Sequence, residues 1–311
     1  MGPAVLQNDL VVGNLGNRLG AVSLVATEGS ISNVTMADNR AIAIAAVGGA
    51  VAIPAQVTKR GQGCEIEGTS ASLEAVLLCA RHLPVYLVQD AGARRILDTT
   101  PAQVDGTFRL ELESSEGVVA GPCQVATEAH QPVVLSRSGR GWHVRPDRLP
   151  LSPPVPGQQI MQGTVEGVIS AVAGESPPYL VVLEEDTPGL DEGAAVLAAP
   201  PVPGASLRII NSIVWGGEEI VRVAGEAKIE IRYSDLADKS WAGEANINAD
   251  PRFVAPPDDY RLAPGSPAID AGTSVGAPRV DFEGTVRPLD GDGDGRAAWD
   301  LGAYEAQPPP P

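Results

Sequence analysis

The amino-terminal part of the chain contains a repeat that constrains the fold more than any other feature. Leu6–Asn14 aligns with Ile31–Asn39 at a spacing of 25 residues, and both segments have asparagine at the third and ninth positions. A third copy, Ile209–Gly217, has asparagine at the third position and glycine at the ninth. A period in this range is typical of supersecondary units that stack on one another. The repeat therefore predicts a core built from stacked, similar coils.

The residues inside each copy indicate what the coils are made of. Short β-rich runs lie between asparagines and glycines, which tolerate the left-handed conformation of a tight corner. Equivalent strands of stacked coils lie about 4.8 Å apart, so Asn8, Asn33 and Asn211 are expected to form a ladder with a structural role. We therefore predict an all-β fold, a right-handed parallel β-helix (solenoid) in which residues 4–53 stack directly on residues 205–245.

An insertion interrupts the repeat. The period ends after Pro54 and returns near Ala205, and a structureless loop of that length is rare in a compact domain. Strand-like segments alternate with turns in its first half, which favours a small β-sandwich. The expected strands there are Leu73–Cys79, Val85–Gln89, Arg94–Asp98, Thr107–Leu112, Gln124–Ala126 and Val133–Ser136. A helix over Ser72–Leu83 competes with the first strand, because its apolar residues also have helical spacing.

A proline-rich stretch follows the sandwich-like part. Residues 146–157 hold five prolines, a composition typical of a semi-rigid extended linker. Three apolar runs beyond it, Met161–Val172, Tyr179–Glu184 and Ala194–Ala198, either form a small β segment or rejoin the solenoid. The expected domain order is solenoid coils at 1–55, a β-sandwich-like module at 56–145, the linker and small β segment at 146–204, resumed coils at 205–249 and a closing segment at 250–311.

Two parts of the chain resemble known families. The closing segment contains Asp250–Phe253, Asp259–Leu262, Pro264–Gly272, Asp281, Gly284, Arg287–Pro288 and Asp300–Glu305. These motifs, in this order, resemble the closing segment of bacterial right-handed parallel β-helix proteins of the pectin-lyase-like type, known as a choice-of-anchor Q domain. Within the insertion, Leu83–Val88, Gly92 and Val104–Leu110 resemble carboxypeptidase-regulatory-like β-sandwiches.

The first resemblance implies a place outside the cell, because such proteins are secreted or held at the cell surface. It names no reaction. Since Met1 begins almost inside a repeat, and an uncapped solenoid end exposes strand edges, we expect the chain to be part of a longer protein or its first coil to be covered by another chain.

Charge and hydropathy limit the kinds of partner that the chain is expected to bind. The chain has 39 acidic and 22 basic residues, a net charge of -17, which opposes binding to a phosphate backbone and argues against nucleic acid. There is no run of 18 apolar residues, so no membrane span is expected. The three cysteines, Cys64, Cys79 and Cys123, allow one disulfide or three buried thiols.

A carboxylate-rich loop is the strongest candidate ligand site. Asp290, Asp292 and Asp294 alternate with glycines, an arrangement that presents several oxygens to Ca²⁺. The loop differs from an EF-hand because its twelfth position is Leu301, so we add Asp300 as the fourth predicted ligand. The alternative is an ordinary Asp-Gly turn without a metal.

No catalytic residue is predicted. We expect a non-catalytic extracellular or cell-surface protein that acts as a structural spacer or adhesion scaffold and binds a polysaccharide or a protein. One alternative is a polysaccharide lyase or glycoside hydrolase of the pectin-lyase-like fold, which would need paired carboxylates, or carboxylates with Ca²⁺ and a basic residue, on one exposed face of adjacent coils. Another is a component of a phage-like appendage.

Overall fold

The structure, a computed structural model, describes residues 4–14, 21–25, 27–39, 42–48, 51–60, 63–67, 73, 76–77, 80, 85–89, 92–101, 107–127, 131–147, 153–198, 204–216, 219–237 and 241–308. The chain divides into two compact units. The first, which we call the parallel-sheet unit, comprises Met1–Gly48 and Gly204–Pro311, and the second, the inserted unit, comprises Gly49–Pro203.

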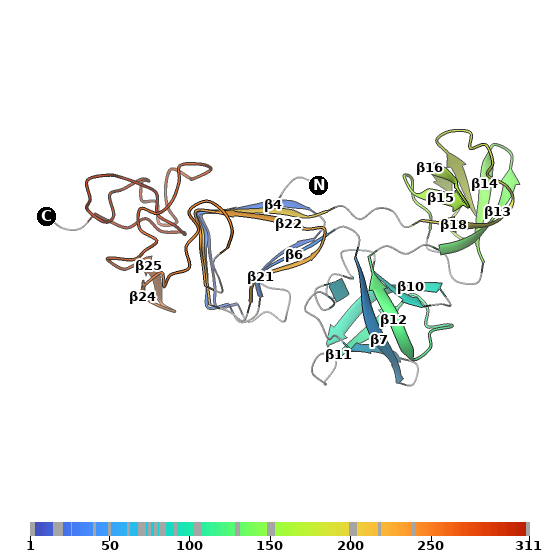
Figure 1. The fold of residues 1–311 in the computed structure, drawn as a ribbon, viewed down its shortest axis with the longest axis horizontal. Helices are drawn as coiled ribbons and strands as arrows, with labels where there is room; N and C mark the ends of the chain where they lie inside the picture. The colour runs from blue at the N-terminus through green and yellow to red at the C-terminus, as the bar shows by residue number, and fades with distance from the viewer. Residues whose placement is uncertain are drawn as a thin grey trace. The chain divides into compact units, whose positions relative to one another are not determined.

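Three parallel sheets form the centre of the parallel-sheet unit (Figure 1). Sheet A has the order β1-β4-β19-β22, sheet B the order β2-β5-β20-β23 and sheet C the order β21-β6-β3. The strands of sheet A are β1 (Ala4–Gln7), β4 (Glu28–Ser32), β19 (Ser206–Ile210) and β22 (Lys228–Arg232). Those of sheet B are β2 (Leu10–Val12), β5 (Thr35–Ala37), β20 (Ile213–Trp215) and β23 (Asp235–Leu236), and those of sheet C are β3 (Val22–Val25), β6 (Ile42–Gly48) and β21 (Glu219–Gly225).

Strands on opposite sides of the insertion are direct neighbours in every sheet. The paired residues are Ile31 with Ile209, Met36 with Val214 and Ile44 with Val221. All six side chains are buried in one apolar cluster. The predicted stacking of the first coils on residues 205–245 is confirmed for these strands.

The corners between sheets A and B have the backbone that the asparagines predict. Asn8, Asn33 and Asn211 have φ values of 57°, 52° and 48°, in the left-handed region where asparagine is enriched. The predicted amide ladder forms at one step only, where Asn211 Nδ2 donates to Asn33 Oδ1 at 3.4 Å. Asn33 Nδ2 and Asn8 Oδ1 are buried without a hydrogen-bond partner, so backbone conformation explains these positions better than side-chain pairing does.

The closing segment packs against the outer side of sheet B. Ile213 points away from the inner core and joins an apolar cluster with Leu262, Ile269 and Leu301. The only regular structure described in the segment is the hairpin of β24 (Phe253–Ala255) and β25 (Asp259–Leu262).

Hydrogen bonds attach the closing segment to successive coils. Gln7 Nε2 donates to the Gly276 carbonyl at 2.9 Å, and the Ala303 N–H donates to Thr35 Oγ1 at 2.9 Å. The Tyr260 hydroxyl donates to Asp38 Oδ2 at 2.6 Å. The segment is therefore a lateral cover of the coils.

The inserted unit contains two closed antiparallel barrels of six strands each. Barrel 1 consists of β7 (Ala52–Arg60), β8 (Gly63–Glu67), β9 (Val85–Gln89), β10 (Gly92–Pro101), β11 (Thr107–Leu112) and β12 (Gly121–Ala126). Barrel 2 consists of β13 (Gln131–Ser138), β14 (Gly141–Pro146), β15 (Gln159–Gln162), β16 (Val165–Ala173), β17 (Tyr179–Leu183) and β18 (Gly193–Leu197).

The two barrels have the same topology. Counted in chain order, the strands of each barrel close in the sequence 1-2-5-4-3-6. The fourth strand of each carries a β-bulge, at Ile96/Asp98 in barrel 1 and at Ile169/Ala171 in barrel 2. Such bulges bend a strand and increase its twist, which helps a sheet to close. The matching topology and bulges indicate that the inserted unit is an internal duplication.

The expected fold class is therefore wrong. The chain is not a right-handed parallel β-helix solenoid of the pectin-lyase-like type, because two closed antiparallel barrels account for much of its strand content and parallel pairing is confined to three short sheets. The insertion is not a β-sandwich either, because bulged strands close each sheet on itself.

The expected boundaries inside the insertion also differ from the structure. The first part was expected to end at residue 145 and to be followed by a linker, but β14 and β15, on either side of the proline-rich stretch, belong to the same barrel. The run Met161–Val172 contains most of a two-strand hairpin, β15 and β16. The prediction of a strand at Leu73–Cys79 is wrong for the residues that the structure describes there, because Leu73, Val76 and Leu77 have helical backbone.

Candidate functional site

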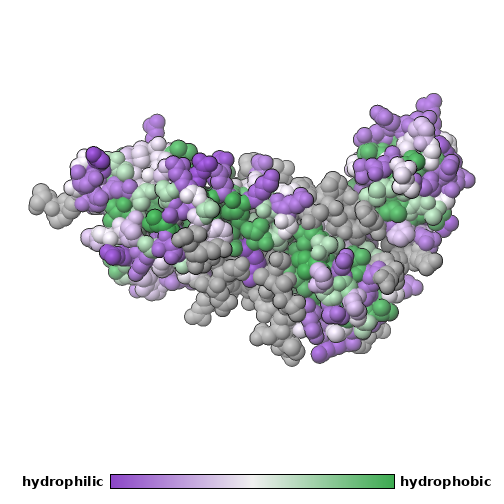
Figure 2. Space-filling model, viewed as in Figure 1, coloured by the Kyte–Doolittle hydropathy of each residue, from purple (hydrophilic) through white to green (hydrophobic). Residues whose placement is uncertain are grey.

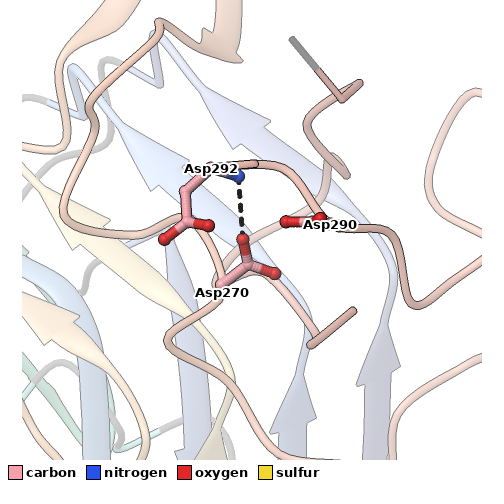
Figure 3. A group of neighbouring side chains, drawn as sticks. All are labelled: Asp270, Asp290 and Asp292. Carbon is pink, nitrogen blue, oxygen red and sulfur yellow. Dashed lines mark hydrogen bonds between the residues drawn. The ribbon is translucent and has the colours of Figure 1, made fainter. Parts of the chain in front are cut away.

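Three carboxylates of the closing segment lie close together (Figure 3). Asp270, Asp290 and Asp292 each offer an oxygen atom, and these oxygens all lie within 4.8 Å of one another. Asp270 follows a buried turn that includes Ala268 and Ile269, whereas Asp290 and Asp292 belong to the Asp-Gly loop. Two separate parts of the segment therefore contribute to one acidic cluster.

Backbone N–H groups hold these carboxylates in place. Asp270 Oδ2 accepts the Asp292 N–H at 2.9 Å, which links the two parts of the cluster. The two oxygens of Asp290 accept the N–H groups of Gly293 and Gly295, both at 2.9 Å. The left-handed backbone of Gly293 and Gly295, with φ values of 80° and 92°, suits glycine and allows the loop to fold around Asp290.

The arrangement satisfies a basic requirement for Ca²⁺. Calcium binds oxygen ligands at about 2.3–2.6 Å, so oxygens up to about 5 Å apart can share one ion. Of the predicted ligands, Asp290 and Asp292 meet in the cluster. Asp294 and Asp300 are not part of it: Asp294 Oδ1 accepts the Arg296 N–H, and Asp300 is buried beneath it. The sequence missed Asp270, whose only signal was its place in the Ile269–Gly272 motif.

A buried ionic network lies beside the cluster and holds the closing segment together. Arg287 Nη1 lies 3.4 Å from Glu305 Oε2, and both side chains are fully buried. Asp300 Oδ1 accepts the Asp270 N–H at 2.7 Å, while Glu305 accepts the N–H groups of Leu289 and Asp300. Burial and the nearby Glu305 charge raise the pKa of Asp300 to about 7. These acids satisfy backbone donors, and their role is structural.

In the inserted unit, each barrel has one loop that is held by a glutamine, and the contacts are the same in both barrels. At the end of β9, Gln89 Nε2 donates to the carbonyls of Val119 and Pro122, and its Oε1 accepts the Val119 N–H. At the end of β15, Gln162 makes the matching three bonds, to both backbone groups of Asp191 and to the Ala194 carbonyl.

In both barrels one glycine with positive φ precedes the last strand and another begins it, at Gly117 and Gly121 in barrel 1 and at Gly189 and Gly193 in barrel 2. We call Gly117–Gly121 and Gly189–Gly193 the clamped loops. The Gly-x-x-x-Gly spacing occurs once in each of these loops, and it is the sequence signal from which the pair of loops could be found.

A groove lies against the clamped loop of barrel 1. Its volume is about 690 Å³, and none of the described residues that line it has a charged side chain. Val119, 60% exposed, forms part of its wall, together with Pro54 and Pro122. Cys123 also borders it, but burial raises the pKa of this thiol to about 11, so the thiol stays protonated near neutral pH. Cys64 and Cys123 are free, buried thiols, whereas Cys79 lies outside the described residues.

Comparison with family models, with curated proteins and with solved structures finds no match for this chain. Within the described ranges, no helix is long and apolar enough to cross a bilayer.

Asp235 is a buried carboxylate outside the closing segment. It lies in β23 and is fully buried. Its Oδ1 accepts the Ala249 N–H at 3.1 Å, but Oδ2 is buried without a hydrogen-bond partner. Burial raises the pKa of Asp235 to about 6, and the nearby charge of Asp250 adds to this effect. The parallel-sheet unit therefore favours the protonated form of this side chain.

This environment predicts a pH-dependent stability. The pKa of Asp235 rises from 3.8 to about 6 on folding, so the folded state binds more protons between these values and the free energy of unfolding falls as the pH rises through this window. The loss reaches roughly 3 kcal/mol at most, at 1.36 kcal/mol per pKa unit. Asp235→Asn should flatten this part of the profile, measured by denaturant unfolding at a series of pH values. Parallel profiles for the two proteins would contradict the assignment.

Proposed function

We propose that the protein is a non-catalytic glycan-binding scaffold that acts outside the cell. The parallel-sheet unit is a stiff platform, and the two barrels present the ligand-binding loops. The observation that carries this proposal is the clamped loop, held by the same glutamine contacts in both barrels.

The attachment of the inserted unit supports a presenting role. It leaves the parallel-sheet unit after β6 and returns before β19, while β6 stays paired with β21 and β4 stays paired with β19. The inserted unit is therefore tethered at both ends to strands that are fixed in one core. Repetition of a binding element on one chain raises the avidity for a repetitive ligand without any new contact.

The chemistry of the clamped loop favours a glycan. A preformed loop loses little conformational entropy on binding, and each glutamine fixes its loop through three hydrogen bonds. The described residues that line the groove beside the loop of barrel 1 are all uncharged, in a chain of net charge -17. Such a groove suits a neutral polymer better than an acidic one.

The extracellular location rests on the resemblance of the closing segment to choice-of-anchor Q domains. The motifs that carry this resemblance have clear structural roles here. Arg287 and Glu305 form the buried ion pair, and Asp281 accepts the N–H groups of Glu283, Thr285 and Glu305.

The proposal predicts that the protein binds polysaccharides without cleaving them. The full chain should be retarded in native gels that contain neutral polysaccharides such as xylan or β-glucan, and it should release neither new reducing ends nor unsaturated products from these or from pectin and alginate. Replacing both clamps, Gln89→Ala with Gln162→Ala, should weaken retardation several-fold, because each loop loses three hydrogen bonds.

The exposed Gln159→Ala change on β15 is the matched control and should leave retardation unchanged. Product release from any of the four polymers would contradict the proposal and favour a lyase or hydrolase. Unretarded migration of the unchanged protein in every gel would also contradict it.

We also propose that the acidic cluster binds one Ca²⁺ that orders the closing segment. The cluster brings together three carboxylates, and their mutual repulsion decreases when a cation lies between them. An ion bound only by the folded state adds about 2.7 kcal/mol to the free energy of unfolding at a hundredfold excess over its Kd.

Calorimetric titration of the full chain with CaCl₂ should therefore give a saturable heat, and chelator should lower the Tm. Asp292→Asn removes one charge from the cluster and should weaken binding at least tenfold. Asp294→Asn changes a neighbouring carboxylate outside the cluster and is the matched control. Identical melting in Ca²⁺ and in chelator, with no heat of binding, would show an ordinary solvated turn.

A further inference from the structure

A second cavity lies entirely within the closing segment. Its volume is about 450 Å³, within the range of about 300–1,000 Å³ typical of small-molecule sites. Val254, Leu262, Pro264 and Ile269 provide apolar lining. In Figure 2, the closing segment, at the left as in Figure 1, carries both hydrophobic and hydrophilic residues.

Three of the polar side chains that border this cavity, beside Thr285, Glu305 and Gln307, have unused hydrogen-bonding capacity. They are Arg261, Glu283 and Tyr304. Among the described residues, none makes a hydrogen bond to Arg261 Nη1, to the Glu283 carboxylate or to the Tyr304 hydroxyl. These three side chains thus offer one donor, one acceptor and one group that serves as either.

Neighbouring residues fix two of these groups. Asp259 accepts bonds from Arg261 Nε at 2.9 Å and from Arg261 Nη2 at 2.5 Å, which leaves Nη1 as the open end of the guanidinium. The Tyr304 ring packs edge-to-face on Phe282, with centroids 5.7 Å apart. A site held in place before binding loses little conformational entropy when it is filled.

The charges around the cavity select against an anion. Arg261 is paired with Asp259, and the buried Glu305 is paired with Arg287. Glu283 forms no ion pair with any described residue, although its charge acts on Arg261, so the rim carries one more negative than positive charge. An acidic ligand would meet like charge at this rim, and a purely apolar one would leave the three polar groups without partners.

We infer that this cavity binds a neutral pyranose sugar, with its hydroxyls on Arg261, Glu283 and Tyr304 and its C–H face on the apolar lining. Sugars combine these two surfaces in one small ring, and the cavity presents the complement of both. The inference rests on the proposed glycan-binding role but uses none of the residues of the barrels.

Saturation-transfer NMR on the full chain tests this site with free sugars as probes. The panel comprises galactose, glucose, mannose and N-acetylglucosamine, with galacturonate as the charged counterpart. At least one neutral sugar should show transfer and bind more tightly than the charged counterpart.

Tyr304→Phe keeps the ring and removes only the hydroxyl, so it should weaken binding about fivefold, and Glu283→Gln should weaken it about tenfold. The exposed Glu166→Gln change in barrel 2 is the control and should have no effect.

Absence of transfer to every neutral sugar would overturn the inference. Tighter binding of galacturonate, or unchanged affinity in both the Tyr304 and Glu283 variants, would also overturn it. The result is separable from the barrel proposal, because loss of gel retardation in the double glutamine variant depends on Gln89 and Gln162. Sugar binding that survives in that variant supports the cavity site, whereas gel retardation without sugar transfer supports the barrels alone.

Discussion

The backbone pairing between β4 and β19 is the contact on which the rest of the structure depends. It places Ile31 beside Ile209 although the whole inserted unit separates them in sequence. Equivalent pairings in sheets B and C close one apolar core from both parts of the chain. Closing such a long loop carries an entropic cost that grows only slowly with length, so a large insertion is compatible with this core.

The closing segment depends on that core in turn. Sheet B has an inner face in the central cluster and an outer face that would be exposed without the segment. Ile213 fills the outer cluster, and Asn211 exchanges two hydrogen bonds with Thr273, at 2.6 Å and 2.9 Å. The acidic cluster and the sugar-sized cavity both belong to this segment. The geometry of the cluster and of the cavity therefore depends on the attachment of the closing segment to sheet B.

The sequence predicted the local features that depend on backbone chemistry. Asparagines with left-handed φ at the corners, and the limits of β9 and β11, follow from turn residues and β-rich runs. The spacing of Asn8, Asn33 and Asn211 also indicated the pairing across the insertion. These features are local or repeated, so a single sequence contains enough information to find them.

The barrels and the complete acidic cluster were not predictable in the same way. Closure of a sheet depends on which strands meet and on bulges such as Ile169/Ala171, and alternation along a strand does not distinguish a barrel from a sandwich. The solenoid was inferred from the repeat and from the resemblance of the closing segment, whereas the described strands of the insertion pair antiparallel. Asp270 joins Asp290 and Asp292 only through the fold of the closing segment, so no spacing of residues along the chain identifies it as a ligand.

Disulfide trapping across β4 and β19 tests the central claim most directly. Ser30 and Arg208 are paired neighbours of sheet A, and adjacent strands about 4.8 Å apart bring Cα atoms within the disulfide range of about 4.4–6.8 Å. The double change Ser30→Cys with Arg208→Cys should therefore give a crosslink between positions 30 and 208 on mild oxidation, detected by peptide mapping. Ser30→Cys with Glu230→Cys spans two strand spacings and should give none. A crosslink in the second variant and none in the first would contradict the account.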